Sequence, residues 1–286
     1  MMLSKIIAAC LLTVCGAIAA EASSASAALP ELGRCVKVTG VVEGKRTHYN
    51  GAYTNKTCTH VSESHKGKFE WEPGPGEKNK FFSFGTEPEP TLETVGGAKV
   101  GCSTMAFQGA EYTGPKTATV KKVVFTGCEE AGVPCQTIPT QNAEIEGSEF
   151  TMELGVISAG AKPVVGWDLK KEGDAFLFEC GKLPELRSTQ TLEGSVIGAL
   201  KAGATGDVNH MSILAPINYR ESAGKQLPEA FEGGVKDTLT NTTITESLSK
   251  TTEQAGVTAT MELESGTGEK GIEPENQEPL EVKTIG

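Results

Sequence analysis

Arginine is scarce in this chain, and the few arginines are scattered. Only four occur among the 286 residues, and the formal net charge is -11 at pH 7. Nucleic acids and anionic membranes are bound through clustered lysine and arginine side chains. The composition therefore excludes nucleic-acid binding. Aspartate is equally scarce, so glutamate carries nearly all of the negative charge.

The chain also lacks a long apolar run, because a membrane-spanning helix needs about 20 apolar residues. Its N-terminus instead combines Lys5, a short apolar stretch over Ile6–Ala20 and the small residues Ala25-Ser26-Ala27. This order is typical of a secretory signal peptide. We expect cleavage after Ala27, a mature chain without a membrane span, and an extracellular or cell-surface location. A membrane anchor and a lipoprotein lipidated at Cys10 are the alternatives.

Two of the eight cysteines lie in this leader, and six remain for the mature chain. The six are Cys35, Cys58, Cys102, Cys128, Cys135 and Cys180. An even number in an exported chain predicts disulfides, although sequence alone does not fix the pairing. The short loop from Cys128 to Cys135 favours a bridge there. Cys35 and Cys58 flank the first polar segment, which leaves Cys102 with Cys180. A zinc site is the alternative, but it would lack any C-x-x-C pair.

Short runs of alternating apolar and polar residues continue along the mature chain, separated by glycine, proline, asparagine and serine. Examples lie at residues 35–38, 68–72, 118–126, 143–146, 175–180 and 279–285. Alternation is typical of strands with one face in water. We therefore predict an all-β fold, an antiparallel sandwich or barrel with many short strands, braced by disulfides. The best helical candidate, Leu227–Leu239, is interrupted by Gly233-Gly234.

Two proline- and glycine-rich stretches are expected to be loops. The first, Pro73–Pro90, suggests a boundary between a small cysteine-containing β module over residues 28–90 and a main β domain over residues 91–286. Residues 1–27 form the signal peptide. The second, Glu264–Pro279, precedes a final alternating run that we expect to pair in a sheet.

Several sequence blocks resemble uncharacterised secreted proteins of soil actinobacteria. The blocks lie at residues 33–38, 67–74, 91–97, 113–118, 125–128 and 194–198. The first reads Gly33-Arg34-Cys35-Val36-Lys37-Val38, and the last reads Gly194-Ser195-Val196-Ile197-Gly198. The resemblance runs through most of the mature chain. It implies export and a shared β fold, and it implies no activity.

Catalytic and cofactor motifs are missing from the sequence. There is no G-x-S-x-G, H-E-x-x-H, Walker, EF-hand or dinucleotide motif. Two S-x-x-K matches, at Ser222 and Ser247, fall in polar, turn-like sequence and are expected by chance. His60, Glu63 and His65 lie near Cys58, but their spacing matches no known metal-ligand pattern. We predict no catalytic residue, no cofactor and no metal site.

Only two tryptophans are present, whereas sugar-binding surfaces usually use exposed aromatic rings. Trp71 alternates with glutamates on a strand-like run and is expected in the core. Trp167 precedes Asp168, and this pair is the one candidate for contact with a ligand. Packing of Trp167 in the core is the favoured interpretation.

These observations predict a secreted, non-catalytic structural or binding protein whose partner is an unknown extracellular protein or glycan. Two alternatives stay open. An extracellular glycan hydrolase would show a cleft with two carboxylates, one with a raised pKa. An inhibitor would present the Cys128–Cys135 loop as a rigid protrusion, whereas a binder would show an exposed apolar patch.

Overall fold

The computed structural model describes residues 30–77, 79–138, 142–161, 163–181, 187–200, 203–205, 208–210, 214–232, 235–266 and 280–284. These residues form strands, turns and loops but no helix, which confirms the all-β class. It follows that no helix in this part of the chain could cross a membrane. The expected signal peptide lies outside the described residues.

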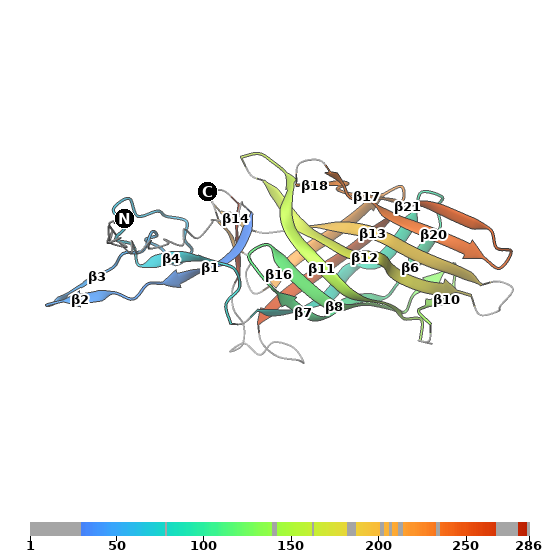
Figure 1. Cartoon of the computed structure of the whole chain (residues 1–286), viewed down its shortest axis with the longest axis horizontal. Coiled ribbons are helices and arrows are strands. Elements are labelled where there is room, and N and C mark those ends of the chain that lie inside the picture. The colour runs from blue at the N-terminus through green and yellow to red at the C-terminus, as the bar shows by residue number, and fades with distance from the viewer. Residues whose placement is uncertain are drawn as a thin grey trace, which may run out of the picture.

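Eight strands, taken in chain order, form a closed antiparallel barrel (Figure 1). They are β5 (Lys80–Thr94), β7 (Thr104–Tyr112), β8 (Thr117–Thr126), β11 (Ile145–Ser158), β12 (Val164–Cys180), β13 (Ser188–Leu200), β20 (Leu239–Thr245) and β21 (Lys250–Gly266). Each strand pairs with the next, and β21 pairs with β5 to close the ring. Of the two architectures expected, the barrel is therefore the one adopted.

The barrel is filled mainly by the side chains of alternate strand residues. On β21, Val257 and Met261 point inward among other buried apolar residues, as alternation along a strand requires. Near one end, the rings of Phe81 and Tyr112 stack with centroids 4.3 Å apart. Tyr112 lies 6.0 Å from the ring of Trp167. These three aromatic side chains form a packed layer across that end of the interior.

The barrel wall has a seam beside β13, which a side chain closes. β13 pairs with β20 as far as Gly194 and with β16 (Leu214–Ser222) from Ala199 onward. In between, Gln226 of β17 (Lys225–Leu227) replaces the missing strand. Its Oε1 accepts from the Ile197 amide at 3.0 Å, and its Nε2 donates to the Ser195 carbonyl at 3.1 Å. The side-chain amide thus acts as a peptide group would.

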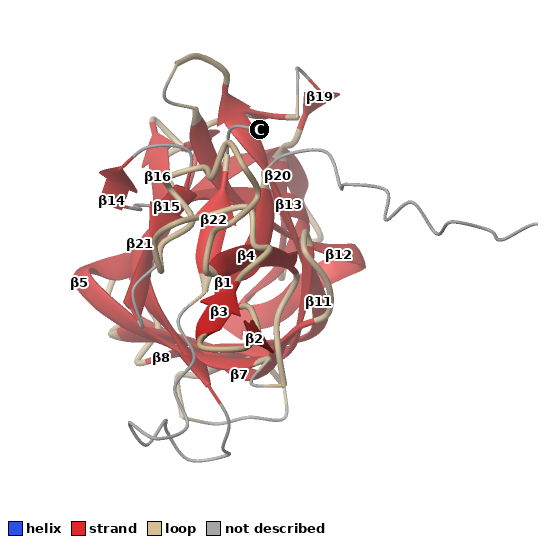
Figure 2. Cartoon of the chain, turned by 90° about the vertical axis from the view of Figure 1, so that its left-hand side faces the viewer, coloured by secondary structure: helices blue, strands red, loops and turns tan. Residues whose placement is uncertain are grey.

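A five-stranded sheet covers the end of the barrel next to the aromatic layer (Figure 2). Its strands, in order, are β14 (Gly203–Thr205), β15 (Val208–His210), β22 (Glu281–Lys283), β1 (Glu31–Lys37) and β4 (Phe69–Pro73). Leu32 and Val282 of this sheet are buried in the core of the barrel. The final alternating run therefore pairs in a sheet, as expected. The domain boundary at residue 90 stays a prediction. Strand pairing joins the segments before and after this residue, because β1 pairs with β22.

The N-terminal part beyond this sheet has a small core of its own. The Cys35–Cys58 disulfide, which was predicted, packs with Trp71 there. Trp71 is buried as expected, and its Nε1 donates to Glu31 at 2.7 Å. A hairpin of β2 (Val41–Glu43) and β3 (Arg46–His48) projects away from the barrel (Figure 1).

Three short strands form an end cap at the opposite end of the barrel, where β6 and β10 are labelled on the right of Figure 1. They are β6 (Lys99–Gly101), β9 (Glu129–Glu130) and β10 (Val133–Gln136). The cap begins on β5, to which β6 pairs, and ends on β12, to which β10 pairs. Because β5 and β12 lie four strands apart in a ring of eight, the cap joins opposite sides of the barrel.

Both disulfides of the end cap differ from the predicted pairs. The bridges are Cys102–Cys128 and Cys135–Cys180, not Cys128–Cys135 and Cys102–Cys180. The prediction used loop length, but strand pairing decides which side chains meet. Cys135 lies directly opposite Cys180 in the β10–β12 ladder. The β6–β9 ladder ends beside Cys102 and Cys128.

The loop expected over Pro73–Pro90 is wrong in its second half, because β5 begins at Lys80. Its Pro88 and Pro90 fall where β5 leaves the β7 ladder, so few amide donors are lost there. The helical candidate at Leu227–Leu239 forms short strands instead. β18 (Ala230–Phe231) and β19 (Val235–Lys236) pair with each other on the outside of the barrel.

Candidate ligand cavity

An apolar cavity of about 60 Å³ lies inside the barrel beneath the end cap. Val100 and Cys102 of the cap line its upper part, and Leu192, Val196 and Val257 line its wall. Among the described residues that line it, only Thr91 and Tyr219 have a polar side-chain atom, and the Tyr219 hydroxyl is itself buried. No charged side chain of the described residues takes part in the lining. The space therefore suits an uncharged, apolar occupant.

Tyr219 and Leu169 form the floor of this cavity. Tyr219 lies on β16, opposite Ala259 of β21. Its ring fits against Gly198, where an added Cβ would lie 2.8 Å from the ring atom Cε1. Glycine at this position therefore makes room for the ring. Below the floor lies Trp167, the next inward residue on β12 after Leu169.

Two polar atoms in this region of the interior have no hydrogen-bond partner. They are the hydroxyl oxygen of Tyr219 and the Nε1 of Trp167. Burial, followed by the charge of Asp168, raises the pKa of Tyr219, so the hydroxyl keeps its proton. Both groups are therefore hydrogen-bond donors inside an apolar space, where unmet hydrogen-bonding capacity is costly.

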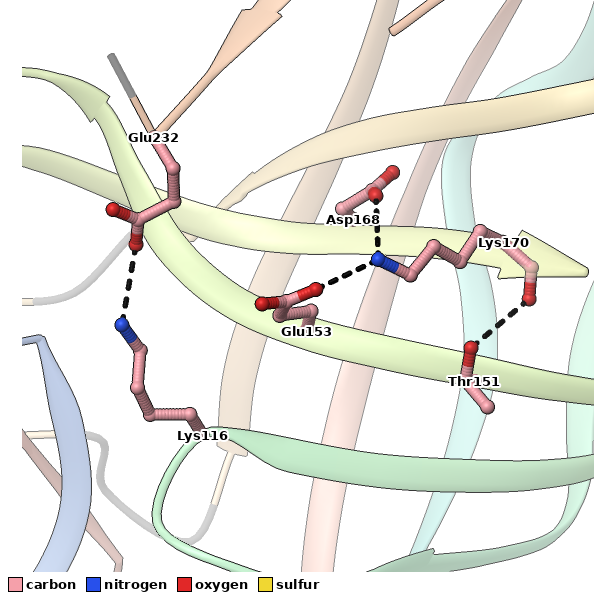
Figure 3. Close-up of polar contacts among 6 residues, drawn as sticks. All are labelled: Lys116, Thr151, Glu153, Asp168, Lys170 and Glu232. Atoms are coloured by element: carbon pink, nitrogen blue, oxygen red, sulfur yellow. Dashed lines mark hydrogen bonds and ion pairs between the residues drawn. The ribbon is translucent and has the colours of Figure 1, made fainter. Parts of the chain in front are cut away.

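Asp168 lies on the other face of the same wall. Because successive residues of a strand alternate, Trp167 points into the barrel and Asp168 points out. Asp168 is nevertheless only 1% exposed. The covering segment, residues 224–232 and 235–237, lies over this part of the outer wall. Its Glu232 accepts from the Val156 amide at 3.2 Å and pairs with Lys116 at 3.3 Å (Figure 3).

Lys170 links two carboxylates on this outer face. Its Nζ lies 2.7 Å from Glu153 Oε2 and 3.7 Å from Asp168 Oδ2 (Figure 3). The hydrogen bond to Glu153 raises the pKa of Lys170. Burial, and then the charge of Asp237, raises the pKa of Asp168 to about 6, although a Ser195 hydrogen bond and the Lys170 charge oppose the rise. Asp168 Oδ1 is buried without a partner.

A raised carboxyl pKa is one mark of an acid–base catalyst. Asp168 lacks the other mark, which is access to a substrate. It lines neither the barrel cavity nor the groove described next, and the covering segment shields it from solvent. The buried charge of Asp168 therefore lowers the stability of the fold.

An outer groove of about 260 Å³ opens where β11 and β12 separate. Its lining includes Glu146, Asp174 and Glu179, the kind of carboxylates that a glycan hydrolase would need. Glu146 lies 2.9 Å from Lys122 and Glu179 lies 3.2 Å from Arg187. Two of the three carboxylates are thus held in ion pairs on the rim, which does not favour a catalytic pair.

The structure separates the residues singled out in the sequence. Trp167 and Asp168 lie on opposite faces of the barrel wall, so they do not share a ligand. His60, Glu63 and His65 are exposed on a loop. Ser222 and Lys225 pair across the β16–β17 turn, and the Ser247 match lies in the β20–β21 turn.

Within the described residues, one group has the spacing of metal ligands, namely Glu130 with Cys135 and Cys180. The two cysteines are bonded to each other, so neither offers a thiolate. The Cys128–Cys135 segment is a hairpin paired on both sides, to β6 and β12. It is part of the end cap and not a separate protruding loop.

Sequence reasoning missed Tyr219 and the cavity. The alternation in Ile217-Asn218-Tyr219-Arg220 could have placed Tyr219 on an inward face. Nothing in a single strand, however, reveals the space that eight strands enclose. Comparisons of the chain with protein-family models, curated protein sequences and solved structures found no match.

Proposed function

We propose that this chain is an exported, non-catalytic binding protein whose barrel holds a small, apolar molecule. The observation that carries the proposal is the apolar cavity, which is enclosed by a closed eight-stranded barrel and covered by an end cap. Barrels of eight strands are just wide enough either to fill with side chains or to hold one small ligand. Here side chains fill most of the interior and leave a cavity of about 60 Å³ toward the end cap.

The N-terminal leader and the three disulfides support the exported part of the proposal. Disulfides persist in non-reducing compartments, and all six cysteines of the mature chain are bridged. A glycan ligand is less well supported, since Trp71 and Trp167 are both buried. Neither ring offers a sugar an exposed face.

A cavity-filling variant tests the proposal. Val257→Phe adds an aromatic ring to the cavity wall, so we expect it to abolish binding of xenon and isopentane, measured by NMR titration. Dry apolar cavities of proteins take up such probes. Because filling a void recovers about 24 cal/mol per Å³, we expect up to about 1.4 kcal/mol of added stability for a cavity of about 60 Å³.

Val164→Phe is the matched control, because Val164 is 43% exposed on the outside of the barrel. It should bind both probes as the wild type does. Absence of xenon and isopentane binding in the wild-type protein would refute the proposal. The proposal would also be refuted if Val257→Phe bound xenon and isopentane as tightly as the Val164→Phe control does.

A further inference from the structure

The N-terminal part of the chain differs in charge from the rest. Residues 30–77 contain seven lysines and arginines and six glutamates, whereas residues 79–286 contain 17 lysines and arginines and 30 aspartates and glutamates. We infer that the N-terminal part carries a second binding surface, which takes an acidic polysaccharide, an extended glycan chain with repeated carboxylates. This surface lies outside the barrel, and the inference does not depend on the cavity.

The first support is that the cations of this part are free, whereas half of its carboxylates are engaged. Glu31 is buried and accepts from the indole of Trp71. Glu72 pairs with Arg34 at 2.9 Å, and both carboxylate oxygens of Glu70 accept from main-chain amides. The free cations are exposed and form no ion pair with another described residue; they are Lys37, Lys45, Arg46, Lys56, Lys66 and Lys68. Six free cations thus face three exposed glutamates.

The second support is the way the free cations are spread. Lys45 and Arg46 lie at the tip of the β2–β3 hairpin, which projects from the molecule (Figure 1). At its base, Lys37 of β1 and Lys68, just before β4, lie on adjacent strands, and Lys68 Nζ lies 5.6 Å from the ring centroid of Tyr49. The cations therefore follow the hairpin over about 10 Å. This spread suits a chain of spaced charges better than a single small anion.

The third support is the hairpin itself. Its residues 41–48 are all exposed, and within the described part of the chain β2 and β3 pair only with each other. Two-stranded ribbons of this kind are marginally stable in water by themselves, so packing does not explain why the hairpin projects. The hairpin does hold Lys45 and Arg46 away from the barrel, whose carboxylates repel a polyanion.

An acidic glycan fits this surface better than a nucleic acid does. Five of the six free cations are lysines, whereas bidentate phosphate recognition favours arginine. Duplex DNA also carries one charge per about 1.7 Å of its axis, so the acidic barrel repels it strongly. Recognition through charge needs no exposed aromatic ring, and the burial of Trp71 and Trp167 does not oppose it.

The test titrates the full protein with a galacturonate oligomer and with its methyl ester, which has the same sugar chain without the charges. Isothermal titration calorimetry gives the dissociation constants. We expect the wild type to bind the oligomer but not the ester, and to bind less tightly as salt screens exposed charges. Lys45→Glu/Arg46→Glu should weaken binding on the order of tenfold, because two exposed ion pairs are lost and two repulsive contacts replace them.

Lys121→Glu/Lys250→Glu is the matched control, because it changes the net charge equally at exposed lysines of the barrel. It should leave the affinity nearly unchanged. Absence of binding by the wild type, or equal weakening in the two double variants, would overturn the inference. Tighter binding of single-stranded DNA or of anionic phospholipid vesicles than of the oligomer would also overturn it.

Self-association is the remaining outcome. If the wild type forms oligomers without the glycan and Lys45→Glu/Arg46→Glu is monomeric, the hairpin binds the acidic barrel of a second copy and the inference is wrong. Sedimentation velocity measures this directly, and we expect both proteins to be monomeric. Xenon and isopentane binding tests the cavity separately, so either proposal can fail while the other stands.

Discussion

Replacing Cys135 and Cys180 together by alanine should lower the free energy of unfolding by about 4 kcal/mol. The bridge closes a loop with a sequence separation of 45 residues, and the chain-entropy relation for a loop of that length gives about 4 kcal/mol. The bridge also ties the end cap to β12 over the cavity. We therefore expect faster release of isopentane from the variant, measured by NMR exchange, in addition to a lower midpoint in urea.

Cys35→Ala/Cys58→Ala is the control for this effect. Its loop has a sequence separation of 23 residues, so a loss of similar size, about 3 kcal/mol, is expected in stability. This bridge lies in the N-terminal core, away from the cavity, and the rate of isopentane release should not change. Equal release rates in the two double variants would contradict the assignment of the end cap as the cover of the cavity.

Asp168→Asn should stabilise the protein by about 3 kcal/mol at pH 7, since each pKa unit is worth about 1.4 kcal/mol. The folded-state pKa of Asp168 is about 6, raised from an ordinary value of 3.8. The native state therefore binds the proton more tightly than the unfolded state does. Asp168 thus makes the wild type less stable as the pH rises from about 4 to about 6, and its cost is constant above that.

The asparagine variant removes the titrating group, so its advantage should shrink to less than about 1 kcal/mol near pH 4. Urea unfolding of both proteins across this pH range measures the difference. Asp174→Asn is the control, because Asp174 lies on the same strand but is exposed; a change within about 0.5 kcal/mol is expected. A gain for Asp168→Asn that did not vary with pH would contradict the burial of a charged carboxylate there.

The strand pattern carried most of the information that the sequence holds about this fold. The alternating runs near residues 118–126 and 175–180 are parts of β8 and β12, because strands with one wet face need that period. The sequence could not decide between sandwich and barrel. That choice depends on the β5–β21 pairing, which joins segments far apart in the chain.

The failures have a common cause in long-range pairing. The predicted Cys128–Cys135 bridge was the cheapest loop to close, but opposing strands bring each of these cysteines to a more distant partner. The Pro73–Pro90 stretch was expected to be a loop from its composition, yet Lys80 onward is held in the barrel by neighbours on both sides. In both cases, contacts between distant segments of the chain override the preference that loop length or local composition indicates.

The candidate site was predictable only in part. The burial of Trp167 followed from its apolar neighbours, whereas the burial of Asp168 on the opposite face depends on its cover, residues 224–232 and 235–237. The cavity depends on the sum of side-chain volumes around a ring of strands, and no short motif encodes that sum. The absence of a catalytic motif in the sequence favoured a binding function but did not identify the binding site.

The amide of Gln226 gives the barrel wall a point of local opening. Around most of the ring, adjacent strands are joined by rows of main-chain bonds. Beside Ser195 and Ile197, the Gln226 side chain holds two bonds next to a single main-chain bond from the Ser195 amide to the Thr238 carbonyl. A rotamer change of Gln226 would release both of these bonds, together with its bond to the Asp237 carbonyl, without separating any strand pair. Val196, between these two residues, lines the cavity. Opening of the wall at this point would uncover Val196 from the outside, and amide hydrogen exchange at Ile197 would report how often it occurs.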